Sequence, residues 1–132
     1  MSAPQNSPEI GREILAAGYR TNLHDSGEGF PLMMIHGSGP GVTAWANWRL
    51  VMPELAKRRR VIAPDMLGFG YSERPRSTVW TPARQARLLH HALQELQVDR
   101  AIVVGHSFRF LADARHDETL RGPARRLLEE TP

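Results

Sequence analysis

Short apolar runs, each bounded by glycine, proline or polar residues, recur through the first 105 residues of the chain. The runs at 13–17 and 19–24 are separated by Gly18 and predict a β-hairpin. Three later runs each predict a buried strand, because they are short, almost wholly apolar and bounded by turn residues. They lie at 31–35, 61–63 and 101–104. The run at 101–104 has no polar residue, so we expect it to be buried on both faces of a sheet.

Apolar residues recur with helical spacing at two places in the chain. Between 82 and 96 they follow the i, i+3, i+4, i+7 pattern of an amphipathic helix, at Leu89, Ala92, Leu93 and Leu96. Thr81 is expected to cap this helix, with Pro82 at its first position. A second apolar face is expected to begin after an N-cap at Thr43 and to bend at Pro53. It comprises Trp45, Trp48, Leu50, Val51 and Leu55.

The predicted order is hairpin, strand, helix, strand, helix, strand, which is typical of an α/β fold with a mostly parallel sheet and helices on both faces. We assign this domain to residues 9–108 and expect residues 1–8 to form a disordered lead. Residues 109–132 carry five basic and five acidic residues and no further apolar run. They fit no predicted element of the sheet, and we expect a helical or disordered tail.

Composition narrows the class of protein. At 132 residues, 41% hydrophobic and 23% charged, the chain has the size and balance of one soluble globular domain. It has no cysteine, so disulfides and thiolate metal sites are excluded. No apolar run approaches the roughly 20 residues that span a bilayer, and no signal peptide is recognisable at the start. We therefore expect a cytoplasmic protein without a membrane partner.

The positive charge of the chain does not indicate a nucleic-acid partner. The formal net charge is only +3, and the basic residues are spread along the chain except for a run at 57–60. That run follows a predicted helix, where cations complement the helix dipole, and we favour a solvated helix end over a phosphate-binding patch. His90 and His91 are adjacent on a helix and therefore point about 100° apart, so they do not form a metal-binding pair.

The candidate chemistry begins where the last apolar run ends, at Gly105-His106-Ser107. A strand followed by Gly-x-Ser is most of the nucleophile elbow Gly-x-Ser-x-Gly, a strand-to-helix turn that exposes a serine hydroxyl. The final glycine of that motif is replaced by Arg109. Ser107 is therefore our candidate nucleophile. The alternative is a serine that only caps the following helix.

Residues 1–76 resemble the meta-cleavage product hydrolases, a group of α/β-hydrolases, and residues 77–108 resemble α/β-hydrolases more generally. The segments that carry this resemblance are His36-Gly37-Ser38-Gly39-Pro40-Gly41, Trp45-Ala46-Asn47-Trp48 and Pro64-Asp65-Met66-Leu67-Gly68-Phe69-Gly70-Tyr71-Ser72-Glu73-Arg74-Pro75. The resemblance implies hydrolysis of a carbon–carbon bond in a small vinylogous diketone, without a metal or an organic cofactor. His106 departs from the asparagine that is typical of that group, which leaves a generic esterase as an alternative.

The resemblance also implies roles for individual residues. Ser107 would attack the substrate, and the backbone N–H groups of Ser38 and Phe108 would stabilise the oxyanion. The other residues assigned to the substrate site are Gly37, Gly39, Asn47 and His106. For Asn47, which would bind the polar end of the substrate, the alternative is a capping or loop residue.

The histidine base and its orienting aspartate have no evident match in the chain. In this fold they follow the nucleophile, on loops after later strands. His116 would lie about 13 Å along a helix from Ser107, far beyond the roughly 3 Å that a catalytic hydrogen bond needs. His36 and His106 are not expected to act as the base. The sequence thus predicts a hydrolase truncated after its nucleophile strand and impaired in catalysis. The alternative is a non-catalytic remnant whose strand at 101–104 pairs with another chain.

Overall fold

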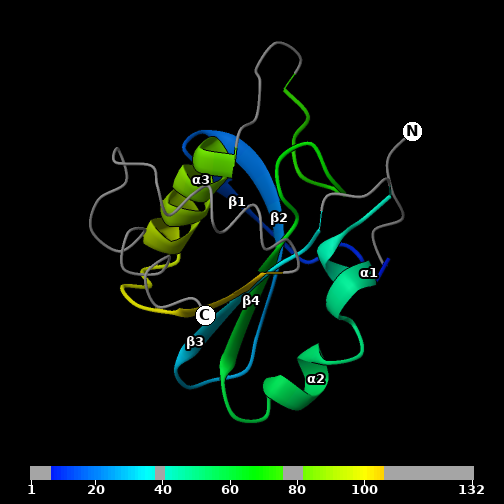
Figure 1. The fold of residues 1–132 in the computed structure, drawn as a ribbon, viewed down its shortest axis with the longest axis vertical. Helices are drawn as coiled ribbons and strands as arrows, with labels where there is room; N and C mark the ends of the chain where they lie inside the picture. The colour runs from blue at the N-terminus through cyan, green and yellow to red at the C-terminus, as the bar shows by residue number, and fades with distance from the viewer. Residues whose placement is uncertain (1–6, 38–40, 76–81, 106–132) are drawn as a thin grey trace.

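The computed structural model describes residues 7–37, 41–75 and 82–105, which form a five-stranded sheet with helices on both faces. The strands are β1 (Arg12–Ala16), β2 (Tyr19–Ser26), β3 (Pro31–Ile35), β4 (Arg60–Pro64) and β5 (Ile102–Gly105), in the spatial order β1-β2-β4-β3-β5. The described helices are α1 (Ala44–Trp48), α2 (Met52–Leu55) and α3 (Pro82–Glu95). Figure 1 shows α3 on one side of the sheet and α1 with α2 on the other. The predicted α/β architecture is confirmed.

The predicted hairpin is formed by β1 and β2, which pair antiparallel with Ala16 opposite Tyr19. Its turn consists of Ala17 and Gly18, both with positive φ, at 53° and 86°. Positive φ at both central residues matches the right-handed twist of the flanking strands, as in a type I′ turn. The hairpin joins the rest of the sheet through β2, which pairs antiparallel with β4.

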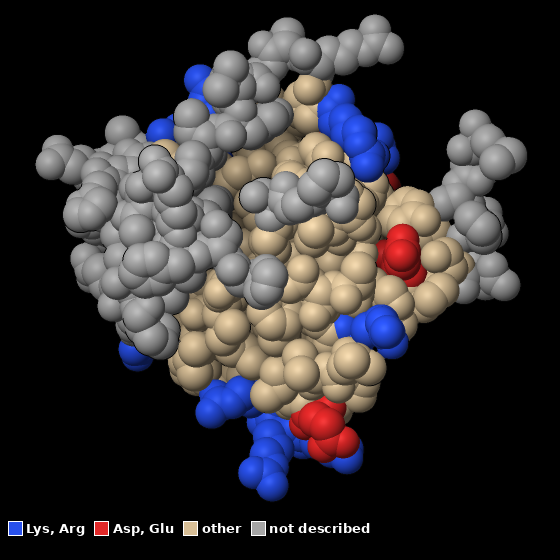
Figure 2. Space-filling view, turned by 45° about the vertical axis from the view of Figure 1, so that its right-hand side comes forward, with Lys and Arg blue, Asp and Glu red and all other residues tan. Residues whose placement is uncertain are grey.

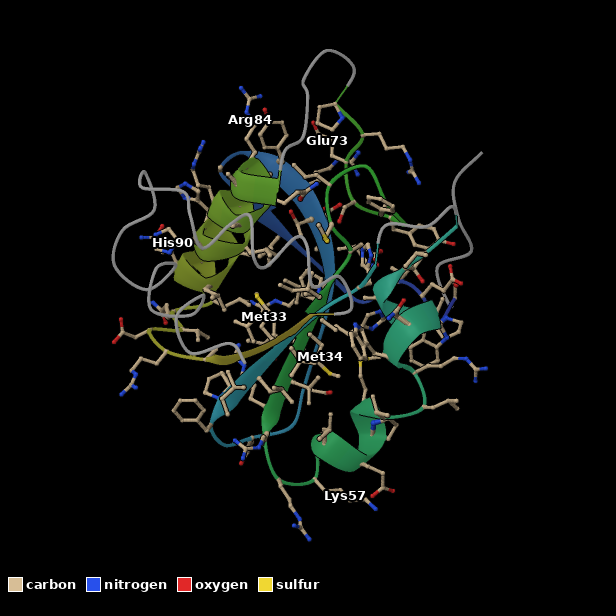
Figure 3. The ribbon with its side chains drawn as sticks, viewed as in Figure 1. Met33, Met34, Lys57, Glu73, Arg84 and His90 are labelled. Carbon is tan, nitrogen blue, oxygen red and sulfur yellow. The ribbon has the colours of Figure 1, made fainter. Side chains whose placement is uncertain are left out.

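Strand β3 lies between β4 and β5 in the sheet and pairs parallel with both of them. Its side chains alternate between two cores, as Met33 and Met34 illustrate in Figure 3. Met33 packs in the cluster that includes Leu93 of α3, whereas Met34 packs with Ala44 of α1 and Met52 of α2. The continuous apolar sequence of β3 is therefore explained by burial on both faces.

Strand β5 departs from the predicted burial on both faces. Val103 is buried beneath α3, but Val104 is 37% exposed. Within the described part of the sheet, β5 lies at the edge and pairs only with β3. The apolar sequence of β5 therefore does not by itself bury Val104.

The prediction of one bent helix around Pro53 is wrong, because the chain forms two short helices instead. Pro53 has no N–H to donate to the carbonyl of Arg49, and Arg49 is where α1 ends. Proline is tolerated in the first turn of a helix, and Pro53 lies in the first turn of α2. The connecting residues Leu50 and Val51 are 76% and 43% exposed, so they do not belong to a buried helical face.

Two of the four residues in the basic run at 57–60 are engaged in ion pairs. Arg60 binds the carboxylate of Asp25 with two hydrogen bonds of 2.9 and 2.8 Å, and this lowers the pKa of Asp25. Lys57 lies 3.1 Å from Glu54 in the preceding helix. Figure 2 shows the coloured charges mainly around the rim of a broad uncharged area.

The described residues provide no group of three or more histidines and carboxylates that could hold a metal ion. His90 is half-buried and His91 is exposed, with their ring centroids 5.7 Å apart. None of the described helices is long and apolar enough to cross a membrane.

Candidate active site

The carboxyl ends of β3, β4 and β5 meet at one edge of the sheet, where open α/β sheets bind their ligands. The register pairs Ile35 at the end of β3 with Gly105 at the end of β5. The glycine-rich segment that begins at His36 and the segment that leads to Ser107 therefore leave the sheet from adjacent positions. Strand β4 ends beside them and continues into Asp65 and Met66.

Most of the site residues expected from the sequence lie outside the described residues. They are Ser107, Ser38, Phe108, Gly39 and His106, together with Arg109 and the rest of 109–132. Their assigned roles therefore stay predictions. The structure places Gly37 two residues after the end of β3, where it is buried.

Asn47 lies inside α1, where its backbone N–H donates to the carbonyl of Thr43 at 3.0 Å. The alternative of a capping or loop residue is therefore wrong for Asn47. Thr43 is the N-cap, as predicted, and its hydroxyl accepts a hydrogen bond of 3.0 Å from the N–H of Ala46. Asn47 is half-buried, and its role in substrate binding stays a prediction.

Both ring nitrogens of His36 are engaged in hydrogen bonds inside the fold. It is only 1% exposed, and its Nε2 accepts a hydrogen bond of 2.9 Å from the N–H of Met66. Its Nδ1 lies 2.5 Å from the carbonyl oxygen of Gly37 and donates to it. An imidazole that accepts through one nitrogen and donates through the other is neutral. Burial lowers the pKa of His36, which favours this neutral form.

The lowered pKa of His36 predicts that the fold weakens as the pH falls. Above about pH 6.5 the imidazole is neutral in both the folded and the unfolded chain, and no stability is lost. Below that value the unfolded chain binds a proton and the folded chain does not, until the pH reaches the lower pKa of the folded state. The free energy of unfolding, measured in urea, should therefore be lower at pH 5.5 than at pH 7.5.

Variants of the two histidines show which of them causes this pH dependence of the free energy of unfolding. Burial also lowers the pKa of His90, so both His36→Gln and His90→Gln should make the pH dependence shallower. The double variant should be flatter than either single one. Full retention of the wild-type slope in His36→Gln would contradict the prediction.

A buried carboxylate, Asp65, organises the end of β4. It is 1% exposed, and its Oδ1 accepts a hydrogen bond of 2.8 Å from the N–H of Ala44, the first residue of α1. Its Oδ2 accepts from the side-chain amide of Asn22 at 2.9 Å and from the N–H of Tyr71 at 3.0 Å. Three donors compensate the loss of water around this carboxylate.

Two neighbouring polar residues extend this arrangement, and we call Asn22, Asp65 and Ser72 the Asp65 cluster. The hydroxyl of Ser72 donates to the carbonyl of Asp65 at 2.6 Å and accepts from the N–H of Asn22 at 2.9 Å. The side-chain oxygen of Asn22 also accepts from the N–H of Gly11 at 2.8 Å. The cluster thus joins the segment before β1, strand β2 and the loop after β4.

The Asp65 cluster was not found by the sequence analysis, in which Asp65 only contributed to a resemblance. The sequence offered one signal for it, namely a carboxylate that directly follows a buried strand and is itself followed by two glycines. Gly70 is one of these glycines, and a Cβ at its position would lie 2.2 Å from Oδ2 of Asp65. Asn22 had no such signal, because it contacts Asp65 across 43 residues of sequence.

The chain belongs to the alpha/beta hydrolase fold family, whose pattern matches residues 31–108. Among curated proteins it is 65% identical to 2-hydroxymuconate semialdehyde hydrolase of Pseudomonas sp. (strain CF600), over 92% of this chain and 44% of the relative. It is 56% identical to 2-hydroxy-6-oxo-2,4-heptadienoate hydrolase of Pseudomonas putida, over 76% of this chain and 36% of the relative. The chain thus spans less than half the length of these relatives.

Solved structures give the same assignment. The meta-cleavage product hydrolase CumD of Pseudomonas fluorescens IP01 matches with a TM-score of 0.80 and 43% identity. The match covers 88% of this chain and 43% of that protein. The resemblance to meta-cleavage product hydrolases that the sequence indicated is therefore confirmed.

Proposed function

We propose that this chain is the nucleophile-bearing part of a hydrolase that cleaves a carbon–carbon bond in a ring-fission product of the 2-hydroxymuconic semialdehyde type. The observation that carries the proposal is the pairing of Ile35 with Gly105, which starts the glycine-rich segment and the Gly-His-Ser segment from adjacent strand ends. The 65% identity to a 2-hydroxymuconate semialdehyde hydrolase supports this substrate class.

In the proposed mechanism, the hydroxyl of Ser107 attacks the carbonyl next to the bond that breaks. The N–H groups of Ser38 and Phe108 stabilise the oxyanion that forms. Asn47 binds the polar end of the substrate. Collapse of this oxyanion breaks the carbon–carbon bond, and the departing carbon takes up the proton given up by the Ser107 hydroxyl, so that a 2-hydroxydienoate leaves and an acyl group stays on Ser107. Water then hydrolyses this ester and releases the carboxylic acid. The serine needs a base to become a good nucleophile, and the Asp113 and His116 that follow it in the expected order come too soon after it to lie on loops after later strands.

The test is a spectrophotometric assay of the purified 132-residue chain with the yellow ring-fission product, beside Ser107→Ala. We expect at most trace turnover, because without a histidine base the hydroxyl of Ser107 stays protonated and is a poor nucleophile at neutral pH. This trace should disappear in Ser107→Ala. Equal rates in the two proteins would contradict the role of Ser107. Rapid multiple turnovers would show that a histidine from elsewhere completes the site.

A non-catalytic role as a sheet-edge interaction module is the second candidate function. It is favoured by the edge position of β5 within the described sheet and by the 37% exposure of Val104. An exposed apolar edge strand pairs readily with another chain, and a lysine on it opposes such pairing. Sedimentation should show association of the wild-type chain and less association of Val104→Lys. A wild-type monomer at high concentration would exclude this function.

A further inference from the structure

One segment of the chain, residues 66–69, both binds the imidazole of His36 and covers it. Nε2 of His36 accepts a hydrogen bond of 2.9 Å from the N–H of Met66. The ring of Phe69 lies against the imidazole, with 5.1 Å between the ring centroids and 66° between the ring planes. His36 is only 1% exposed. Movement of residues 66–69 is therefore expected to expose this imidazole to water.

The hydrogen bond between His36 and Met66 requires a neutral imidazole. Nδ1 donates its proton to the carbonyl of Gly37, so Nε2 keeps the lone pair that accepts from Met66. An imidazolium carries an N–H on both nitrogens and has no acceptor left. A protonated His36 would therefore oppose one N–H to another inside the fold, and it would add a buried charge without a hydrogen-bond partner at Nε2.

We propose that His36 is a pH-sensitive switch: when it takes up a proton, residues 66–69 open while the sheet stays folded. In the open form the imidazole is in water, where its charged form is stable. Proton uptake and opening therefore favour each other. This inference goes beyond the proposed function and does not depend on it.

The ends of the segment 66–69 are held by hydrogen bonds that do not involve His36. On one side, the carboxylate of Asp65 accepts from the N–H of Ala44 and from the side-chain amide of Asn22. On the other side, the N–H of Glu73 donates to the carbonyl of Arg20 at 2.9 Å. These contacts attach both flanks of the segment to the rest of the fold, so the opening is expected to be local.

Two further groups set the conditions for opening. Among the described residues, the charge that acts on His36 is that of Asp65. Burial lowers the pKa of His36, and the hydrogen bond to Gly37 and the attraction of Asp65 oppose this effect in part. The side-chain amide of Gln85 donates to the carbonyl of Leu67 at 3.1 Å. This bond opposes opening at every pH, because neither group titrates.

The test is amide hydrogen exchange in the full 132-residue chain labelled with ¹⁵N, at pH 7.5 and pH 5.5. The exchange rate of the Met66 N–H, divided by its intrinsic rate at each pH, gives the opening constant of the segment. The open form binds a proton with the ordinary pKa of histidine, about 6.5, and the closed form binds it only at lower pH. We therefore expect the opening constant at Met66 to be about tenfold larger at pH 5.5 than at pH 7.5.

Dilute urea distinguishes local opening from global unfolding. Global unfolding exposes much surface and its equilibrium constant rises with urea, whereas a local opening responds little. We expect Met66 to have a larger opening constant than Ile62 in the sheet at both pH values, and to be insensitive to dilute urea. An opening constant at Met66 that is independent of pH, or that equals that of Ile62 and rises equally with urea, would overturn the proposal.

His36→Gln removes the titration but keeps an acceptor for the N–H of Met66, because the glutamine side chain has a carbonyl oxygen. The opening constant at Met66 in this variant should differ by less than about twofold between the two pH values. The matched control is His90→Gln, which replaces a histidine in α3 whose pKa is also lowered by burial. It should retain the tenfold rise. Retention of that rise in His36→Gln would contradict the switch.

The wild-type imidazole provides a second measurement if His36→Gln does not fold. The ¹⁵N signals of His36 report whether Nε2 carries a proton. As the pH is lowered, protonation of Nε2 and loss of protection at Met66 should occur together. Complete protonation of His36 with undiminished protection of the Met66 N–H would also overturn the proposal.

Discussion

Replacing Leu93 by alanine is expected to lower the free energy of unfolding by about 2–5 kcal/mol. Leu93 is 1% exposed and packs from α3 into the same core as Met33 and Ile62. Truncation removes apolar contacts and leaves a cavity that a sheet on one side and a helix on the other cannot close. Urea unfolding followed by circular dichroism at pH 7.5 measures the loss.

The matched control is Leu50→Ala, which makes the same chemical change at a side chain that is 76% exposed. Its effect should stay within about 0.5 kcal/mol, because little apolar surface returns to water. Similar losses in the two variants would mean that α3 does not pack on the sheet as described.

Replacing Gly70 by alanine should be strongly destabilising as well, for two separable reasons. Gly70 has a φ of +53°, which costs a residue with a Cβ about 1–2 kcal/mol. The new Cβ would also lie 2.2 Å from the carboxylate of Asp65, so the Asp65 cluster must shift. We expect this displacement to add roughly 1–3 kcal/mol, as is usual for overpacking a closed site.

Gly68→Ala isolates the second contribution. Gly68 has a φ of +87°, but a Cβ at its position would meet no atom within 4 Å. Gly68→Ala should therefore lower the free energy of unfolding only by the cost of a Cβ at a residue with positive φ. Denaturant unfolding of the two variants in parallel gives the difference between them, and a difference near zero would contradict the close packing of Gly70 against Asp65.

The elements of the fold could be predicted because their signals are local. The hairpin around Gly18, the strand 31–35 and the helix from Pro82 each depend on spacing within a few residues. The break of the helix at Pro53 was harder to predict. Proline is compatible with a kink or with a new helix start, and the choice depends on whether Leu50 and Val51 find a surface to pack on. In the structure they do not, and both are exposed.

The candidate site, too, has parts that the sequence predicted and parts that only the structure shows. The resemblance of the glycine-rich segment and of the Gly-x-Ser segment to α/β-hydrolases was available from the residues alone, and the family is confirmed. The hydrogen bonds made by the residues that flank the glycine-rich segment could not be predicted from the sequence. They join Met66 to His36 across 30 residues and Asp65 to Ala44 across 21, and each partner has an ordinary local role that hides the contact.

The sequence by itself therefore determined the order of strands and helices, the family, and the residues expected to carry the chemistry, because periodicity and short motifs depend on near neighbours. Only the tertiary structure decided which strand ends adjoin, that β5 lies at the edge of the described sheet, and that Asp65 is a buried acceptor of three hydrogen bonds. The physical reason is that parallel pairing and the burial of a charge both depend on groups far apart in the chain. Their energies exist only once the sheet has brought those groups together.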